Sequence, residues 1–128
     1  MRNATIYLFI AIAGAWLLMS CSEEKTIVPS ARTMYYADVR HILDVKCATT
    51  ACHAGSKPAV GLNMESYEDI LAGSENGPVV VPGNAEASLL YRTMVGTSAP
   101  AMPIDDTLPR QLSDSIGSWI RDGLFESD

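Results

Sequence analysis

The chain has 128 residues, a length that allows a single domain. Nine basic side chains stand against 15 acidic ones, so the formal net charge is −6 at pH 7. This acidic balance argues against nucleic acid as a partner and against electrostatic adhesion to an anionic lipid surface. It is compatible with attraction to basic patches on partner proteins, and equally with acids that only keep the protein soluble.

Residues 1–20 have the features of a secretory signal peptide. Arg2 gives a positive start, and Ile6 to Met19 form an apolar run that is shorter than the roughly 20 residues of a membrane span. An uncleaved anchor helix is the alternative. The run ends in Leu18-Met19-Ser20-Cys21, which resembles the lipobox of bacterial lipoproteins. That resemblance implies cleavage before Cys21 and lipidation of its thiol, which would anchor the exported protein to a bilayer surface of the cell envelope.

Residues 21–32 are predicted to be a flexible tether, because they combine charged residues with Pro29 and Ser30 and offer little to bury. The folded domain is then predicted to span residues 33–128. A domain of about this size often needs a metal, a disulfide or a cofactor to complete its core.

A helix is predicted over residues 33–46, because its apolar side chains recur at helical spacing and no glycine or proline interrupts it. These apolar side chains are Tyr35, Val39, Ile42 and Leu43. His41 lies off this stripe and is expected to face solvent, not to act as a ligand. The helix leads directly into Cys47.

The strongest functional signal is the segment Cys47-Ala48-Thr49-Thr50-Ala51-Cys52-His53, called the heptad below. A cysteine directly before a histidine is typical of c-type haem attachment, in which two thiols bond to the porphyrin and the imidazole binds the iron. The usual spacer between the cysteines is two residues, whereas four stand here. Three alternatives stay open on these residues alone: a Cys47–Cys52 disulfide, a zinc site that includes His53, and two unrelated thiols. Zinc lacks a second ligand pair, since Cys21 and His41 are the remaining residues of these types.

Short helices and irregular loops are predicted in the middle of the chain. Ser66 is the expected N-cap of a helix over residues 67–71, and another helix is expected over residues 86–94. The valines at 79–81 are expected to form a buried loop, because the run is too short and isolated for a sheet.

The C-terminal part is predicted to be a loop followed by a helix. Residues 97–109 lack periodicity, are interrupted by prolines and contain Met102. Residues 109–125 place their apolar side chains on one helix face. Gly117 within this helix costs roughly 1 kcal/mol relative to alanine, which a close helix crossing would explain.

The order of these features resembles class I cytochrome c domains, most closely the planctomycete-type variant of exported bacterial proteins. The features are the first helix, Cys-x4-Cys-His, Gly-Leu-x-Met, Val-Pro-Gly-Asn-x-x-x-Ser-Leu-Leu-Tyr, Met-Pro, and a helix ending in Trp-Ile-Arg-Asp-Gly. The resemblance covers about residues 38–124. It implies a small all-α fold, in which the N- and C-terminal helices cross over a haem that irregular loops surround.

The same resemblance implies the site residues. Cys47 and Cys52 correspond to the covalent attachments of one haem c, His53 to the proximal iron ligand and Met102 to the distal ligand. The four-residue spacer departs from the family pattern, and it bears on the efficiency of attachment more than on haem binding.

Met102 has alternatives of its own. A methionine before a proline can simply pack in the core, and Met64 and Met94 are rivals for the distal position. Met94 is expected on a packed helix, whereas a ligand needs a loop that can curl over the iron. Met102 is therefore the predicted ligand.

A thioether opposite an imidazole suits electron transfer, and the two together would leave the iron no open position for a substrate, which argues against an enzyme. The predicted function is a lipid-anchored monohaem cytochrome that carries single electrons between exported redox partner proteins, in the periplasm or at the cell surface. One alternative is a non-redox helical interaction module stapled by a Cys47–Cys52 disulfide. Another is a haem sensor whose distal Met102 leaves to admit a gas.

Overall fold

The computed structural model describes residues 32–104 and 106–127. The predicted signal peptide, the predicted lipidation site Cys21 and the predicted tether up to residue 31 lie outside the described residues. Arg32, the last residue of the predicted tether, is described, and its guanidinium pairs with the Asp38 carboxylate at 2.7 Å.

Four α-helices form the described part of the chain. They are α2 (Tyr36–Lys46), α3 (Tyr67–Ala72), α4 (Leu89–Met94) and α5 (Arg110–Asp122). A short 3₁₀-helix, η2 (Ala59–Gly61), lies between α2 and α3 in the chain. Within these residues there is no β-strand, and an isolated bridge between Ser74 and Gly77 closes a turn. The predicted all-α fold class is confirmed.

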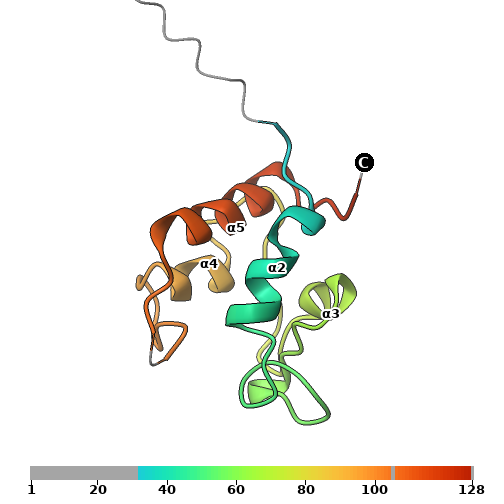
Figure 1. The fold of residues 1–128 in the computed structure, drawn as a ribbon, viewed down its shortest axis with the longest axis vertical. Helices are drawn as coiled ribbons and strands as arrows, with labels where there is room; N and C mark the ends of the chain where they lie inside the picture. Colours follow the sequence, from blue (N-terminus) through green and yellow to red (C-terminus); the bar gives the residue numbers. More distant parts are fainter. Residues whose placement is uncertain (1–31, 105, 128) are drawn as a thin grey trace, which may run out of the picture. The chain divides into compact units, whose positions relative to one another are not determined.

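Helices α2 and α5 cross and pack against each other, so the first and last helices of the domain meet as predicted (Figure 1). Side chains from both helices are fully buried in the core; they are Val39, Leu43, Ile116, Trp119 and Ile120. Burial of one large apolar side chain stabilises a fold by about 1.5–3 kcal/mol. The crossing therefore makes a large contribution to the stability of this domain.

Three aromatic rings cluster at the start of α2. The ring centroid of Tyr36 lies 5.5 Å from that of Tyr67 and 5.8 Å from that of Trp119. The indole Nε1 of Trp119 donates to the Phe125 carbonyl at 2.9 Å, and the Tyr67 hydroxyl donates to the Leu124 carbonyl at 2.7 Å. These bonds fold the segment after α5 back onto the aromatic cluster.

Gly117 lies where α5 contacts α4. A Cβ at this position would lie 2.6 Å from Cε2 of Tyr91, well inside van der Waals contact. The predicted close crossing is confirmed, and its partner is α4. Arg121 covers the same ring, with its guanidinium carbon 5.2 Å from the centroid, and pairs with Glu86 at 2.7 Å.

Two of the predicted helices begin later than expected. Helix α2 begins at Tyr36 where residue 33 was predicted, and α4 begins at Leu89 where residue 86 was predicted. Ahead of α4, the Ser88 hydroxyl donates to the Asn84 carbonyl at 2.8 Å and accepts from the Val81 N–H at 2.8 Å. These bonds fold the residues before α4 into a turn.

The remaining local predictions agree closely with the structure. The Ser66 hydroxyl caps α3 by accepting from the Asp69 N–H at 3.1 Å. Val79 and Val80 are buried in a loop, although Val81 is exposed. Helix α5 begins at Arg110, one residue later than predicted, and ends at Asp122, three residues before the predicted end. The early end follows from Gly123, which turns the chain with a φ of +121°.

Candidate functional site

The heptad follows α2 directly and forms a tight loop. Cys47 is the C-cap residue of α2, and its N–H donates to the Leu43 carbonyl at 2.9 Å. Inside the loop, the Cys52 N–H donates to the Thr49 carbonyl at 2.8 Å and the His53 N–H donates to the Cys47 carbonyl at 3.2 Å. The four-residue spacer is thus folded into a turn, and the three predicted site residues lie together in one loop.

The two thiols of the heptad are free and have different surroundings. Cys52 is exposed, whereas Cys47 is half-buried and packs against the hydrophobic core. Burial raises the pKa of the Cys47 thiol to about 11, and the neighbouring Cys52 adds to the rise. At neutral pH the Cys47 thiol is therefore protonated. No disulfide joins these two described cysteines.

His53 is buried, and its ring is oriented by a backbone carbonyl. Its side chain is 9% exposed, and Nδ1 lies 3.3 Å from the carbonyl oxygen of Leu62. A carbonyl oxygen can only accept, so this contact requires a proton on Nδ1, and in a neutral ring Nε2 then keeps its lone pair. This tautomer leaves Nε2 able to bind a metal, in the arrangement by which proteins orient ligating imidazoles.

The Leu62 carbonyl can orient His53 although the two residues are nine positions apart in the chain. The reason is the intervening η2 turn, which brings the chain back toward the heptad. Two further bonds hold this return: the Ala59 N–H donates to the Cys52 carbonyl and the Met64 N–H donates to the His53 carbonyl, both at 2.8 Å. The imidazole is therefore mounted on a loop with fixed ends.

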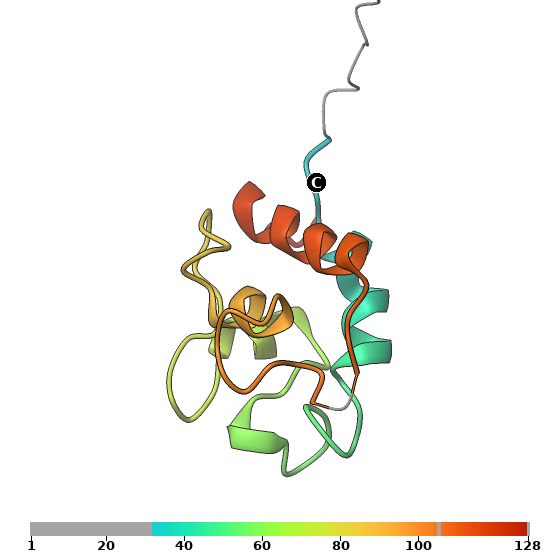
Figure 2. The same ribbon diagram turned by 90° about the vertical axis from the view of Figure 1, so that its left-hand side faces the viewer.

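Met102 lies in the loop between α4 and α5, drawn in orange in Figure 2. Its side chain is half-buried, and its N–H donates to the Thr93 carbonyl near the end of α4 at 3.0 Å. Further along the same loop, the Asp106 carboxylate pairs with the Lys46 ammonium at 2.9 Å. Lys46 immediately precedes Cys47, so this ion pair connects the Met102 loop to the heptad.

The other candidates weighed from the sequence have different positions. Met64 and Met94 both belong to the hydrophobic core, with side chains 1% and 9% exposed. His41 is exposed on α2, as predicted. Across residues 32–104 and 106–127, no group of three or more His, Cys, Asp or Glu side chains is placed to hold a metal ion.

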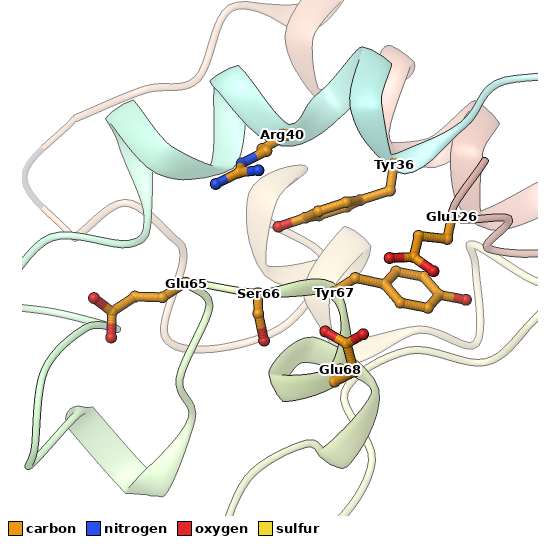
Figure 3. A pocket seen from close by; sticks show the side chains of 7 residues that line it. All are labelled: Tyr36, Arg40, Glu65, Ser66, Tyr67, Glu68 and Glu126. Carbon is orange, nitrogen blue, oxygen red and sulfur yellow. The ribbon is translucent and has the colours of Figure 1, made fainter.

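A separate hollow of about 140 Å³ lies between α2, α3 and the C-terminal segment (Figure 3). Its lining is polar and consists of Tyr36, Arg40, Glu65, Ser66, Tyr67, Glu68 and Glu126. None of the four predicted haem residues lines it. The buried Tyr36 hydroxyl finds no hydrogen-bond partner in the described part of the chain, and burial raises the pKa of this phenol.

Two parts of the site had no sequence signal. The Leu62 carbonyl is a backbone group, which residue types do not mark, and the Lys46–Asp106 pair joins residues 60 positions apart.

Within the residues that the structure describes, no helix has both the length and the apolar character needed to cross a bilayer.

A family model described as "Planctomycete cytochrome C" matches residues 50–106. The matched stretch includes Cys52, His53 and Met102, and it begins three residues after Cys47. No curated protein and no solved structure matches the chain.

Proposed function

This chain carries a cytochrome c domain of the planctomycete type, and we propose that it is a monohaem c-type cytochrome that transfers single electrons between partner proteins. The observation that carries the proposal is the orientation of the His53 ring. The Leu62 carbonyl holds this buried ring through Nδ1, so Nε2 is available to bind a metal. His53 directly follows Cys52, which is exposed.

Four residues would hold the cofactor. Cys47 and Cys52 would form its two thioether bonds, His53 would bind the iron through Nε2, and Met102 would bind it through sulfur. A haem c held in this way supplies an iron that changes reversibly between the ferric and ferrous states. The Met102 thioether is soft and uncharged, so it favours the ferrous state and raises the potential relative to a second imidazole.

The same ligand set favours a carrier over an enzyme. If His53 and Met102 both bound the iron, no coordination position would be left for a substrate. The exposed residues 49–52 of the heptad loop would offer the contact surface for redox partners. Lipidation of Cys21 would keep the domain at a membrane surface of the cell envelope, where exported partners can reach it.

The direct test is expression together with a cytochrome c maturation system, followed by intact mass and the absorption spectrum of the pyridine haemochrome. We expect a mass increase of one haem and an α band typical of two thioether bonds. Cys52→Ser should give the spectrum of a single thioether. His41→Ala is the control, because this exposed histidine lies on α2, outside the heptad, and its replacement should leave mass and spectrum unchanged.

Two outcomes would contradict the proposal in different ways. A colourless protein with the mass of the unmodified chain and a Cys47–Cys52 disulfide would support the stapled interaction module. A haem protein that binds CO readily when reduced would support the sensor, since CO needs the position that Met102 is proposed to occupy.

A further inference from the structure

The loop that carries Met102 is attached to the helices at few points. Near its start, the Thr97 and Ser98 N–H groups donate to the Arg92 carbonyl at 2.9 and 3.2 Å. Met102 itself donates to the Thr93 carbonyl at 3.0 Å. All three bonds end on α4, so they fix the first half of the loop to α4 and leave its second half free of that helix.

The second half of the loop is held by the side chain of Leu108, which is buried in the core, and by the Asp106 carboxylate, which attaches it to α2. One oxygen of this carboxylate accepts from the Thr107 N–H at 2.8 Å, and the other accepts from the Lys46 ammonium at 2.9 Å. Both oxygens therefore have a partner, and the local bond to Thr107 presets the carboxylate for Lys46. In the described residues, this ion pair is the side-chain bond between the loop and α2.

The position of Lys46 gives this pair a role. Lys46 is the last residue of α2 and immediately precedes Cys47, while Asp106 stands four residues after Met102. Four residues span at most about 14 Å when fully extended. A bond at Asp106 therefore limits how far Met102 can move from the heptad, which a bond on α4 alone does not do.

We propose that Lys46 and Asp106 form a clasp that positions the Met102 loop for ligation of the haem iron. This inference rests on the proposed function, because it takes Met102 as the distal ligand. Lys46 and Asp106 are positioning residues, and neither touches the iron. The clasp lies at the surface, with side chains 34% and 54% exposed, so it acts on the local opening of the loop more than on global unfolding.

Loss of the clasp should change how well an added ligand competes with Met102 for the iron. An exogenous ligand binds when Met102 leaves, so its apparent affinity rises with the open fraction of the loop. One exposed ion pair changes such an equilibrium by about two- to fivefold. Loss of the clasp should therefore increase the affinity for added imidazole by that factor, and added salt should act in the same direction on the unaltered protein.

The experiment titrates ferric, haem-loaded protein with imidazole and follows the loss of the sulfur-to-iron charge-transfer band. Lys46→Met keeps the aliphatic length without the charge, and Asp106→Asn keeps the shape of the side chain. We expect each variant to bind imidazole two- to fivefold more tightly. The double variant should bind imidazole no more tightly than either single variant, because both changes break the same bond. Asp44→Asn is the matched control, since Asp44 pairs with Arg40 on α2 and has no bond to the loop.

The outcomes separate the clasp from the ligand assignment. Met102→Ala should abolish the band, and a band that survives this change would overturn the ligand assignment and the clasp together. A band that depends on Met102 but an unchanged imidazole affinity in both single variants would overturn the clasp alone. Additive effects in the double variant would also overturn it, because they would mean that each charge acts separately.

Discussion

The crossing of α2 with α5 and the two loops that carry the site residues are held by different interactions. At the crossing, large apolar side chains are fully shielded from water. In the heptad loop and the Met102 loop, backbone hydrogen bonds and one ion pair fix the chain, and residues 49–52 are exposed. The difference teaches that stability and function are divided in this domain. The crossing contributes large buried apolar side chains to the core, and the two loops carry the predicted ligands and an exposed surface.

The largest effect is expected at the crossing. Trp119→Ala removes a fully buried indole and its hydrogen bond to the Phe125 carbonyl, so it should lower the free energy of unfolding by about 3–5 kcal/mol. Denaturant unfolding of the haem-loaded protein measures this loss. Val45→Ala, at an exposed position on α2, should change it by less than about 0.5 kcal/mol. A small loss for Trp119→Ala would break the comparison.

The second-largest effect is expected in the alkylation rates of the two heptad thiols. It tests whether the loops are ordered before haem is attached. The pKa of the Cys47 thiol is raised to about 11 in the folded chain by burial. Compared with an ordinary thiol, about a hundredfold less thiolate is then present at pH 8. Alkylation of Cys47 in the haem-free chain should therefore be much slower than that of exposed Cys52, and should accelerate up to about pH 11.

The sign of the associated stability change follows from the same shift. A thiol whose pKa is raised by folding stabilises the fold below its unfolded pKa, and this contribution is lost as the pH rises toward about 11. Equal alkylation rates for Cys47 and Cys52, resolved by peptide mass mapping, would show that the heptad loop takes its shape only with haem.

A smaller loss of unfolding free energy is expected from a substitution where α5 contacts α4. Gly117→Ala places a Cβ against the ring of Tyr91, and overpacking of this kind costs about 1–3 kcal/mol. Gln111→Ala, at an exposed position on the same helix, should be neutral or slightly stabilising. The double variant Gly117→Ala with Tyr91→Ala should recover part of the loss specific to Gly117→Ala. If it does not, helix contact is not the reason for the glycine.

The smallest effects distinguish two tyrosines of the aromatic cluster. Tyr67→Phe removes a hydroxyl that donates to the Leu124 carbonyl, so it should cost about 1 kcal/mol. Tyr36→Phe removes a buried hydroxyl that has no partner in the described part of the chain, so it should be neutral or stabilising. Thermal unfolding of the two variants side by side gives the order. A cost for Tyr36→Phe that equals the cost for Tyr67→Phe would mean that the hydroxyl has a partner in solution.

Much of the fold could be predicted because its signals are local. The apolar spacing that predicts α2 and α5 and the cap at Ser66 depend on residues close together in the sequence. Gly117 indicates a close helix contact, because that position requires a small residue. Helix starts were less predictable, because the hydroxyl bonds of Ser88 decide where α4 begins and depend on how the preceding loop folds. Haem attachment at the two heptad cysteines and iron ligation by His53 and Met102 stay predictions.

The sequence by itself determined the helical class of the fold and its family resemblance, and it predicted the chemistry of the heptad, because cysteine-histidine adjacency and apolar periodicity are properties of neighbouring residues. Only the tertiary structure decided that the Leu62 carbonyl orients His53, that Lys46 reaches Asp106, and that the buried Tyr36 hydroxyl has no hydrogen-bond partner among the described residues. Every residue has a backbone carbonyl, so residue types do not indicate which carbonyl forms a bond. Contacts between distant segments produce no regular spacing in the sequence. Both depend on how the loops return to the helices, which is fixed only when the whole core packs.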